Sequence, residues 1–179
     1  MSLLLRPVLT HGAAALAASA AALAFAAEPR DAATTCGLPD FTETALARIN
    51  DVRARGANCG SGGSFGPAPP VAWSDQLTQA AAAHARDMVT RNYFSHSSAN
   101  GRTLADRVGA AGYGWASLAE NIAGGYPSIA AVVAGWVKSP SHCRNLMAPN
   151  LTQIGLACVP GGEKSTYPNY WTLNMGRPR

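Results

Sequence analysis

The sequence predicts a single domain of the α+β class, and three observations support this. The chain has 179 residues, enough for one domain that buries about 70% of the surface of its unfolded chain. Hydrophobic residues make up 47% and charged residues 13%, the opposite of an intrinsically disordered composition. Segments of helical periodicity precede segments of alternating apolar residues, without the regular alternation of a βαβ protein.

The start of the chain has the three parts of a secretory signal peptide: a basic residue at Arg6, a short apolar run over residues 12–25, and small exit residues in Ala24-Phe25-Ala26. The run is shorter than the about 20 residues that span a bilayer; an uncleaved membrane anchor is the alternative. We therefore expect an exported protein, extracellular or periplasmic, with no transmembrane span in the mature chain. The expected divisions are a signal peptide (1–26), an N-terminal segment (27–39) and a domain (40–179).

The first helix of the domain is predicted over residues 41–55. Its apolar residues recur at helical spacing, and Gly56 ends it. Asp40 and Glu43 are spaced as a capping box at its start. Residues 57–70 are rich in glycine, proline and serine, and we expect an internal loop there because too little mature chain precedes them for a separate core.

The second helix is predicted over residues 75–92, with Ser74 as its N-cap. His84 lies on the apolar stripe of this helix, together with Leu77 and Met88. A histidine at such a position is more often a core residue than a ligand, so we expect His84 in the core.

Three further helices are expected over residues 102–110, 129–137 and 139–147. The middle one has the clearest amphipathic pattern of the chain, with apolar residues at i, i+3, i+4, i+7 and i+8. Val133 and Trp136 lie on its apolar stripe, so both are predicted to be core residues.

Two strands are predicted near the end of the chain, over residues 152–159 and 169–175, where apolar and aromatic residues alternate. Residues 116–123 lie between glycine-rich segments and are too few to assign. Helices that come first and strands that come last favour the α+β class.

Export places the four cysteines in an oxidising compartment, where an even number indicates two disulfides. Three pairings are possible. We favour Cys36–Cys59 and Cys143–Cys158, because each pair brackets one local unit and crosses no other element. The absence of C-x-x-C spacing argues against a cysteine metal site, and the even set argues against a catalytic thiol at Cys143.

Charge gives a separate indication about partners. The net charge of +4 at pH 7 comes from basic residues scattered along the sequence. A nucleic-acid-binding protein would usually concentrate them on one face with aromatic residues between them, so we expect no nucleic-acid partner. Mild basicity suits an anionic cell surface. We expect a monomer.

Three polar residues at the boundaries of predicted elements are candidates for a site: His96, Glu120 and His142. Two neutral imidazoles and a carboxylate form a ligand set for Zn²⁺ that leaves a fourth position for water. The alternatives are three unrelated polar residues, or a structural cluster in which Glu120 holds both histidines by hydrogen bonds. A serine hydrolase that uses Ser95 or Ser141 is disfavoured, because neither serine lies in a G-x-S-x-G elbow.

Around these residues the sequence resembles the CAP superfamily of cysteine-rich secretory proteins, antigen 5 and pathogenesis-related proteins, in its bacterial SCP-like branch. The resemblance runs from about residue 46 to residue 176 and consists of many motifs in order. The motifs are Ile49-Asn50-x-x-Arg53, Pro69-Pro70-Val71-x-Trp73, Ala83-His84-Ala85-Arg86-Asp87-Met88, Phe94-Ser95-His96, Ala111-Gly112-Tyr113-x-Trp115, Glu120-Asn121-Ile122-Ala123, Trp136-x-x-Ser139-Pro140-x-His142-x-x-Asn145-Leu146-Met147, Ile154-Gly155-Leu156-Ala157 and Tyr170-Trp171-Thr172.

The resemblance implies a three-layer α-β-α sandwich with a central antiparallel sheet, and a cleft that holds His96, Glu120 and His142. Many eukaryotic members carry a second cavity glutamate at the position of Ser139. The single carboxylate here weakens mechanisms that need a pair of carboxylates and leaves a metal site possible. Ser141 replaces the usual glycine before the second histidine, a minor change.

Two functions follow from the resemblance. The one we favour is a secreted, non-enzymatic binding module that takes a lipid, sterol-like or cell-envelope ligand into apolar grooves. The other is a metal-assisted hydrolase built on His96, Glu120 and His142, with Zn²⁺ as its cofactor. The cluster contains no identifiable nucleophile and no clear general base beyond Glu120, so no catalytic residue is assigned.

Overall fold

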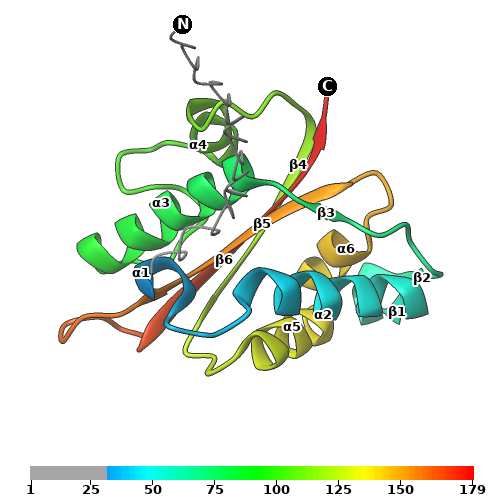
Figure 1. Cartoon of the computed structure of the whole chain (residues 1–179), viewed down its shortest axis with the longest axis horizontal. Coiled ribbons are helices and arrows are strands. Elements are labelled where there is room, and N and C mark those ends of the chain that lie inside the picture. The colour runs from blue at the N-terminus through cyan, green and yellow to red at the C-terminus, as the bar shows by residue number, and fades with distance from the viewer. Residues whose placement is uncertain (1–31) are drawn as a thin grey trace, which may run out of the picture.

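The structure, a computed structural model, describes residues 32–179. The predicted signal peptide and its cleavage point lie outside the described residues. A four-stranded sheet forms the middle of three layers (Figure 1). The helices α3 (Asp75–Arg91) and α4 (Leu104–Ala110) lie on one face, and α2 (Phe41–Arg55), α5 (Ile129–Lys138) and α6 (Pro140–Met147) lie on the other. The predicted α+β class and the three-layer sandwich are confirmed. Within the described part of the chain, no helix has the length and apolarity that a membrane span needs.

The sheet has the strand order β3-β5-β6-β4. Its long strands β5 (Gln153–Pro160), β6 (Asn169–Pro178) and β4 (Trp115–Gly124) pair antiparallel, whereas the two-residue β3 (Ala72–Trp73) pairs parallel with β5. Residues 116–123, which the sequence left unassigned, therefore belong to an edge strand of this sheet. Pairing with β6 along the whole of β4 determines the strand, and this pairing is not visible in the local sequence.

The helices α2 (Phe41–Arg55), α5 (Ile129–Lys138) and α6 (Pro140–Met147) agree closely with their predicted ranges. The short helix α1 (Ala32–Thr35) was not predicted. Ser74 caps α3 as expected, because its hydroxyl accepts a hydrogen bond from the Leu77 N–H. The capping box predicted for Asp40 and Glu43 is wrong: Asp40 has a left-handed backbone with φ of 45°, and its side chain makes no cap hydrogen bond.

Residues 57–70 form the predicted loop, and it contains short elements of regular structure. A small hairpin closes it and a single 3₁₀ turn lies at its tip; these are β1 (Ala57–Asn58), β2 (Ser64–Phe65) and η1 (Gly60–Gly62). The tip lies directly against α6, since a Cβ atom on Gly62 would come within 2.4 Å of the Pro140 carbonyl oxygen. Only glycine allows this approach.

The hydrophobic core lies between the sheet and the layer of α2, α5 and α6. Trp136 is 2% exposed and Val133 is 4% exposed, which confirms both as core residues. Trp136 packs in the same cluster as Trp171 and Leu173 of β6. The amphipathic pattern of α5 therefore identified the buried face of this helix correctly.

Both predicted disulfides, Cys36–Cys59 and Cys143–Cys158, are wrong. The structure joins Cys36 to Cys158 and Cys59 to Cys143. The prediction assumed that partners lie near one another in sequence, but the fold places Thr35 beside Cys158 in a parallel bridge and the loop tip beside α6. The sequence separations are 122 and 84 residues. In the chain-entropy model, loops of this length stabilise the fold by about 4.5–5 kcal/mol each.

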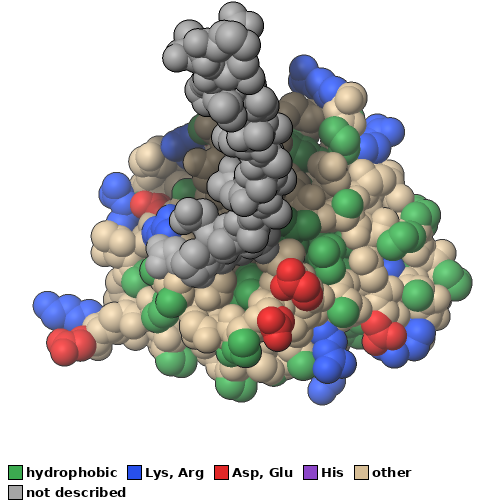
Figure 2. Space-filling model, viewed as in Figure 1, with side chains coloured by type: hydrophobic (Ala, Val, Ile, Leu, Met, Phe, Trp, Pro, Cys, Tyr) green, Lys and Arg blue, Asp and Glu red, His purple; other side chains and the backbone are tan. Residues whose placement is uncertain are grey.

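Charges are dispersed on the face of the molecule that Figure 2 shows. Lysine and arginine side chains lie mainly around its periphery, with acidic side chains among them. The absence of a nucleic-acid partner and the monomeric state stay predictions.

Candidate functional site

The three candidate residues come from three different elements around the edge strand β4. Glu120 lies on β4, His96 lies in the segment between α3 and α4, and His142 lies in the first turn of α6. The His96 side chain is 57% exposed and the Glu120 side chain 2% exposed. The site therefore combines an open imidazole with a carboxylate buried beneath it.

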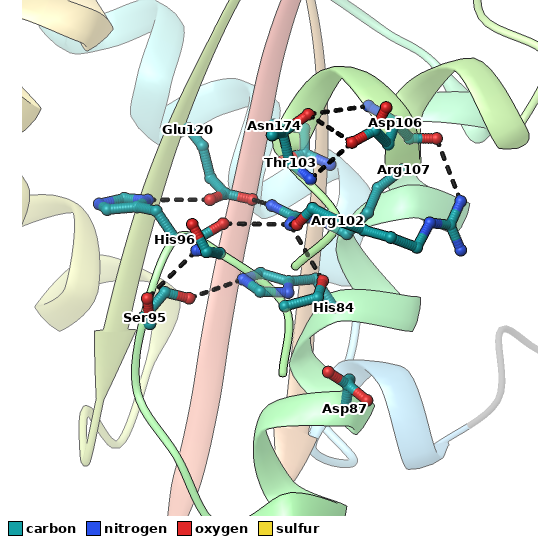
Figure 3. A network of polar contacts seen from close by, with 12 residues as sticks. His84, Asp87, Ser95, His96, Arg102, Thr103, Asp106, Arg107, Glu120 and Asn174 are labelled. Atoms are coloured by element: carbon teal, nitrogen blue, oxygen red, sulfur yellow. Dashed lines mark hydrogen bonds and ion pairs between the residues drawn. The ribbon is translucent and has the colours of Figure 1, made fainter. Parts of the chain in front are cut away.

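Glu120 is the centre of this arrangement, and both of its oxygen atoms are bonded. His96 Nδ1 lies 2.8 Å from Oε1, and Arg107 Nη2 donates to Oε2 at 2.7 Å (Figure 3). The Arg107 side chain is 5% exposed, so the ion pair with Glu120 is buried. An ionised carboxylate only accepts hydrogen bonds, so His96 carries its proton on Nδ1.

Arg107 is the functional residue that the sequence analysis missed. Its second nitrogen, Nη1, donates to the His96 carbonyl at 3.0 Å, to Ser98 Oγ at 3.2 Å and to the Arg102 carbonyl at 3.1 Å. One side chain thus holds both the carboxylate and the backbone of the segment that carries His96. A signal was present in the sequence: Arg107 occupies the i+3 position of the apolar stripe that Leu104 begins in α4.

His84 supports the same segment from below. It is fully buried in α3, and its Nε2 lies 2.9 Å from the Ser95 carbonyl oxygen, so Nε2 carries the proton (Figure 3). Burial lowers the pKa of His84 below its ordinary value, and the nearby Arg107 charge also lowers it. The negative charge of Glu120 raises this pKa, but by less than burial lowers it. His84 is a core residue, as predicted, and its contact fixes the chain one residue before His96.

Side chains from α5 and α6 cover the outer edge of β4. Trp136 Nε1 donates to the Ile122 carbonyl at 3.4 Å, and Asn145 Nδ2 donates to the Glu120 carbonyl at 3.3 Å. Asn121 Nδ2 in turn donates to the His142 carbonyl at 3.1 Å. These contacts protect an edge strand that would otherwise offer free backbone groups. They also explain why the sequence carries tryptophan and asparagine at this spacing.

His142 approaches His96 from the opposite layer. It is half-buried; burial lowers its pKa, and His96 lowers it further by charge repulsion. His142 is therefore neutral at pH 7. Among the residues that the structure describes, Glu120 bonds to His96 and Arg107 but not to His142. Of the cluster in which Glu120 was predicted to hold both histidines by hydrogen bonds, the described residues therefore show the bond to His96 and none to His142.

Within residues 32–179, the geometry does not supply three protein ligands for a metal ion, because no group of three or more His, Cys, Asp or Glu side chains is arranged to hold one. Glu120 is a poor third ligand, because Arg107 already neutralises it and places a positive charge beside it. The arrangement that remains possible is a pair of imidazoles, with Glu120 orienting the ring of His96.

Comparison with known proteins identifies the family. Residues 46–175 match the family CAP, the cysteine-rich secretory protein family. The uncharacterized protein YkwD of Bacillus subtilis (strain 168) is 33% identical over 94 residues, which are 52% of this chain and 37% of YkwD. The uncharacterized membrane protein YlbC of the same strain is 33% identical over 84 residues, 47% of this chain and 24% of YlbC. The chain thus spans much less than half of either relative.

Two solved structures have the same fold. An extracellular protein of Bacillus anthracis that contains an SCP domain has a TM-score of 0.59 and 28% identity, over 78% of this chain and 44% of that one. An outer surface protein from Borrelia burgdorferi has a TM-score of 0.62 and 19% identity, over 76% of this chain and 92% of that one. The match to the family covers most of the chain and includes every candidate site residue. The chain therefore belongs to the CAP family of cysteine-rich secretory proteins.

Proposed function

We propose that the protein works outside the cytoplasm as a binding module for an anionic amphiphile, a single acyl chain with a negatively charged head group. The observation that carries this proposal is an open groove between α2 and α5. Extracellular and outer-surface proteins among the solved relatives support the location.

The groove has a volume of about 320 Å³, at the lower end of the about 300–1,000 Å³ that ligand pockets occupy. Its walls are aliphatic: Val52 comes from α2, and four small apolar residues come from α5, namely Ala130, Val133, Ala134 and Val137. Val133 is nearly buried, whereas Ala134 is exposed, so the groove extends from the core to the surface. An acyl chain matches walls of this kind because they offer no hydrogen-bonding group.

The rim of the groove favours a negative head group. Arg48, Arg55 and Lys138 line it together with a single acidic residue, Asp51. Asp51 forms an ion pair with Arg55 at 2.7 Å, which leaves the positive charges of Arg48 and Lys138 in excess. An anionic head group beside these two residues would complement that excess.

The bonding of Glu120 supports a binding role over a catalytic one. Its carboxylate is bonded on both oxygen atoms, so it is poorly placed to accept a proton from water or substrate. Ser95 Oγ accepts a hydrogen bond from the Ser97 N–H, and within the described residues no hydrogen bond joins it to a histidine. We therefore place the ligand in the groove and assign no catalytic residue.

Palmitate binding to the secreted protein tests the proposal by calorimetry. Ala134→Trp should fill the groove and abolish binding, and Lys138→Glu should weaken it. Ala54→Trp is the matched control, because Ala54 is exposed on α2 and does not line the groove. Wild-type protein that takes up no palmitate, or Ala134→Trp protein that binds it as well as wild type, would refute this function.

Zinc binding by His96 and His142 is a second proposal, favoured by the neutral His142 ring near His96. Because His96 donates from Nδ1 to Glu120, its Nε2 is the nitrogen that would bind the metal. Zinc titration should then show one site that His96→Ala and His142→Ala each remove without loss of the fold. No zinc uptake by wild type would reject a metal-assisted hydrolase as well.

A further inference from the structure

An exposed aromatic ring lies two residues before His96. Phe94 is 42% exposed, and no other large hydrophobic residue in the described part of the chain is exposed. A single exposed apolar residue needs no explanation by itself. The position of Phe94 two residues before His96, and the way in which its ring is held, distinguish it.

Two tyrosines fix the orientation of the Phe94 ring. The Tyr167 ring meets it edge-on with centroids 5.2 Å apart, and the buried Tyr170 ring lies 6.3 Å away. Tyr167 also packs edge-on against Tyr170 at 5.6 Å. A Cβ atom at Gly124 would lie only 2.4 Å from the Tyr167 ring, so the missing side chain on β4 makes room for it.

Backbone and side-chain hydrogen bonds fix the two segments that carry these rings. The Asn92 side-chain oxygen accepts hydrogen bonds from both N–H and Oγ1 of Thr166, each at 3.1 Å. These bonds join the end of α3 to the loop between β5 and β6. On the other side of Phe94, the Ser95 carbonyl is held by His84. The aromatic group is therefore organised before any ligand arrives, which reduces the entropy lost on binding.

A hydrogen-bonding group with a defined direction, the imidazole of His96, lies two residues along the chain from this ring. His96 donates from Nδ1 to Glu120, so in the neutral ring Nε2 is an acceptor, and the side chain is 57% exposed. Arg107 holds Glu120 in place and so fixes the ring of His96 indirectly. The exposed surface thus combines a rigid apolar ring with an acceptor two residues along the chain.

We propose that Phe94 and His96 form a binding site for a neutral glycan. One face of a pyranose ring presents C–H groups, which stack on an aromatic ring, while hydroxyl groups around its edge donate hydrogen bonds. Phe94 matches the first feature and His96 Nε2 the second. A single ring among hydroxyl-bearing side chains is too small an apolar surface for stable insertion into a membrane.

This site is separate from the groove proposed for the acyl chain. Phe94 contacts Tyr170 in the cluster that α3 forms with the sheet, whereas α2 and α5 lie on the other face. The two sites therefore bind independently. Ala134→Trp should leave glycan binding unchanged, so failure of one proposal can be distinguished from failure of the other.

The test is titration of the full-length secreted protein with chitotetraose, followed by NMR and calorimetry. Phe94→Leu keeps an apolar side chain but removes the ring, and we expect about tenfold weaker binding with the fold intact. Phe94→Trp should retain binding, and His96→Ala should weaken it. Phe65→Leu is the matched control, since Phe65 is a half-buried aromatic residue in β2.

Two results would overturn the proposal. Wild-type protein could fail to bind chitotetraose, or Phe94→Leu could bind it as tightly as wild type. In the first case, binding of wild type to phosphatidylglycerol vesicles that Phe94→Leu weakens would make this surface a membrane contact instead. If Phe94→Leu protein proves unfolded, loss of binding by His96→Ala together with retention by Phe94→Trp still decides the question.

Discussion

Replacing Arg107 by methionine tests the central claim about the site, that one buried guanidinium organises it. The substitution keeps much of the side-chain volume but leaves the Glu120 carboxylate, 2% exposed, without its cation. Removing one partner of a buried ion pair costs about 3–5 kcal/mol. Nη1 also serves three acceptors, including the His96 carbonyl, so we expect the upper part of this range.

The assay is urea unfolding followed by tryptophan fluorescence, together with thermal melting. A loss of about 3–5 kcal/mol corresponds to a decrease in Tm of roughly 6–20 °C for a domain of this size. Arg55→Met is the control, because the ion pair of Arg55 with Asp51 is exposed and should contribute less than about 1 kcal/mol. The double variant with Glu120→Gln should recover part of the loss, since no uncompensated charge remains. A cost for Arg107→Met no larger than that of Arg55→Met would refute the reasoning.

Four further predictions follow from the sequence and the structure. Trp136→Ala should cost about 3–5 kcal/mol in urea unfolding, because it removes a buried ring and the donor to the Ile122 carbonyl; a loss under about 1 kcal/mol would contradict its core position. Non-reducing peptide mapping should recover Cys36 with Cys158 and Cys59 with Cys143, and any peptide that links Cys36 to Cys59 would contradict this pairing. Stability should fall as the pH drops below about 6.5, because burial lowers the pKa of His84 in the folded state and the unfolded chain takes up the proton first. His84→Gln should flatten the dependence of the free energy of unfolding on pH, and an unchanged slope of that dependence would exclude His84 as its source. N-terminal sequencing of the exported protein should begin at Ala27, whereas an intact Met1 on membrane-bound protein would contradict cleavage.

The helices were predictable from sequence because their signals are local. The α2 helix begins and ends at the predicted residues, and the start of α3 follows from Ser74, whose cap bond reaches only three residues along the chain. The buried face of α5 follows from the spacing of Val133 and Trp136. The local sequence pattern gave a wrong prediction at Asp40, because its left-handed backbone cannot form the predicted cap.

The sequence predicted three candidate residues of the site, but it predicted neither Arg107 nor the bonds that hold Glu120. The motifs identified His96, Glu120 and His142, but Arg107 lies 13 residues from Glu120 in sequence, and nothing local indicates that the two meet. The edge strand β4 was not assigned because helices cover both of its faces, so adjacent residues such as Glu120 and Asn121 are both buried and no alternation remains.

The sequence by itself determined the class of the fold, the helices after α1 and the two C-terminal strands, because periodicity, caps and motifs depend on neighbours within a few positions. The tertiary structure alone decided the disulfides and the partners of Glu120. Cys36 meets Cys158 only because the chain before α2 lies along β5, and Glu120 meets Arg107 only because α4 packs beside β4. Such pairings depend on which elements become neighbours in space, and that is set by the whole sheet order rather than by any one segment.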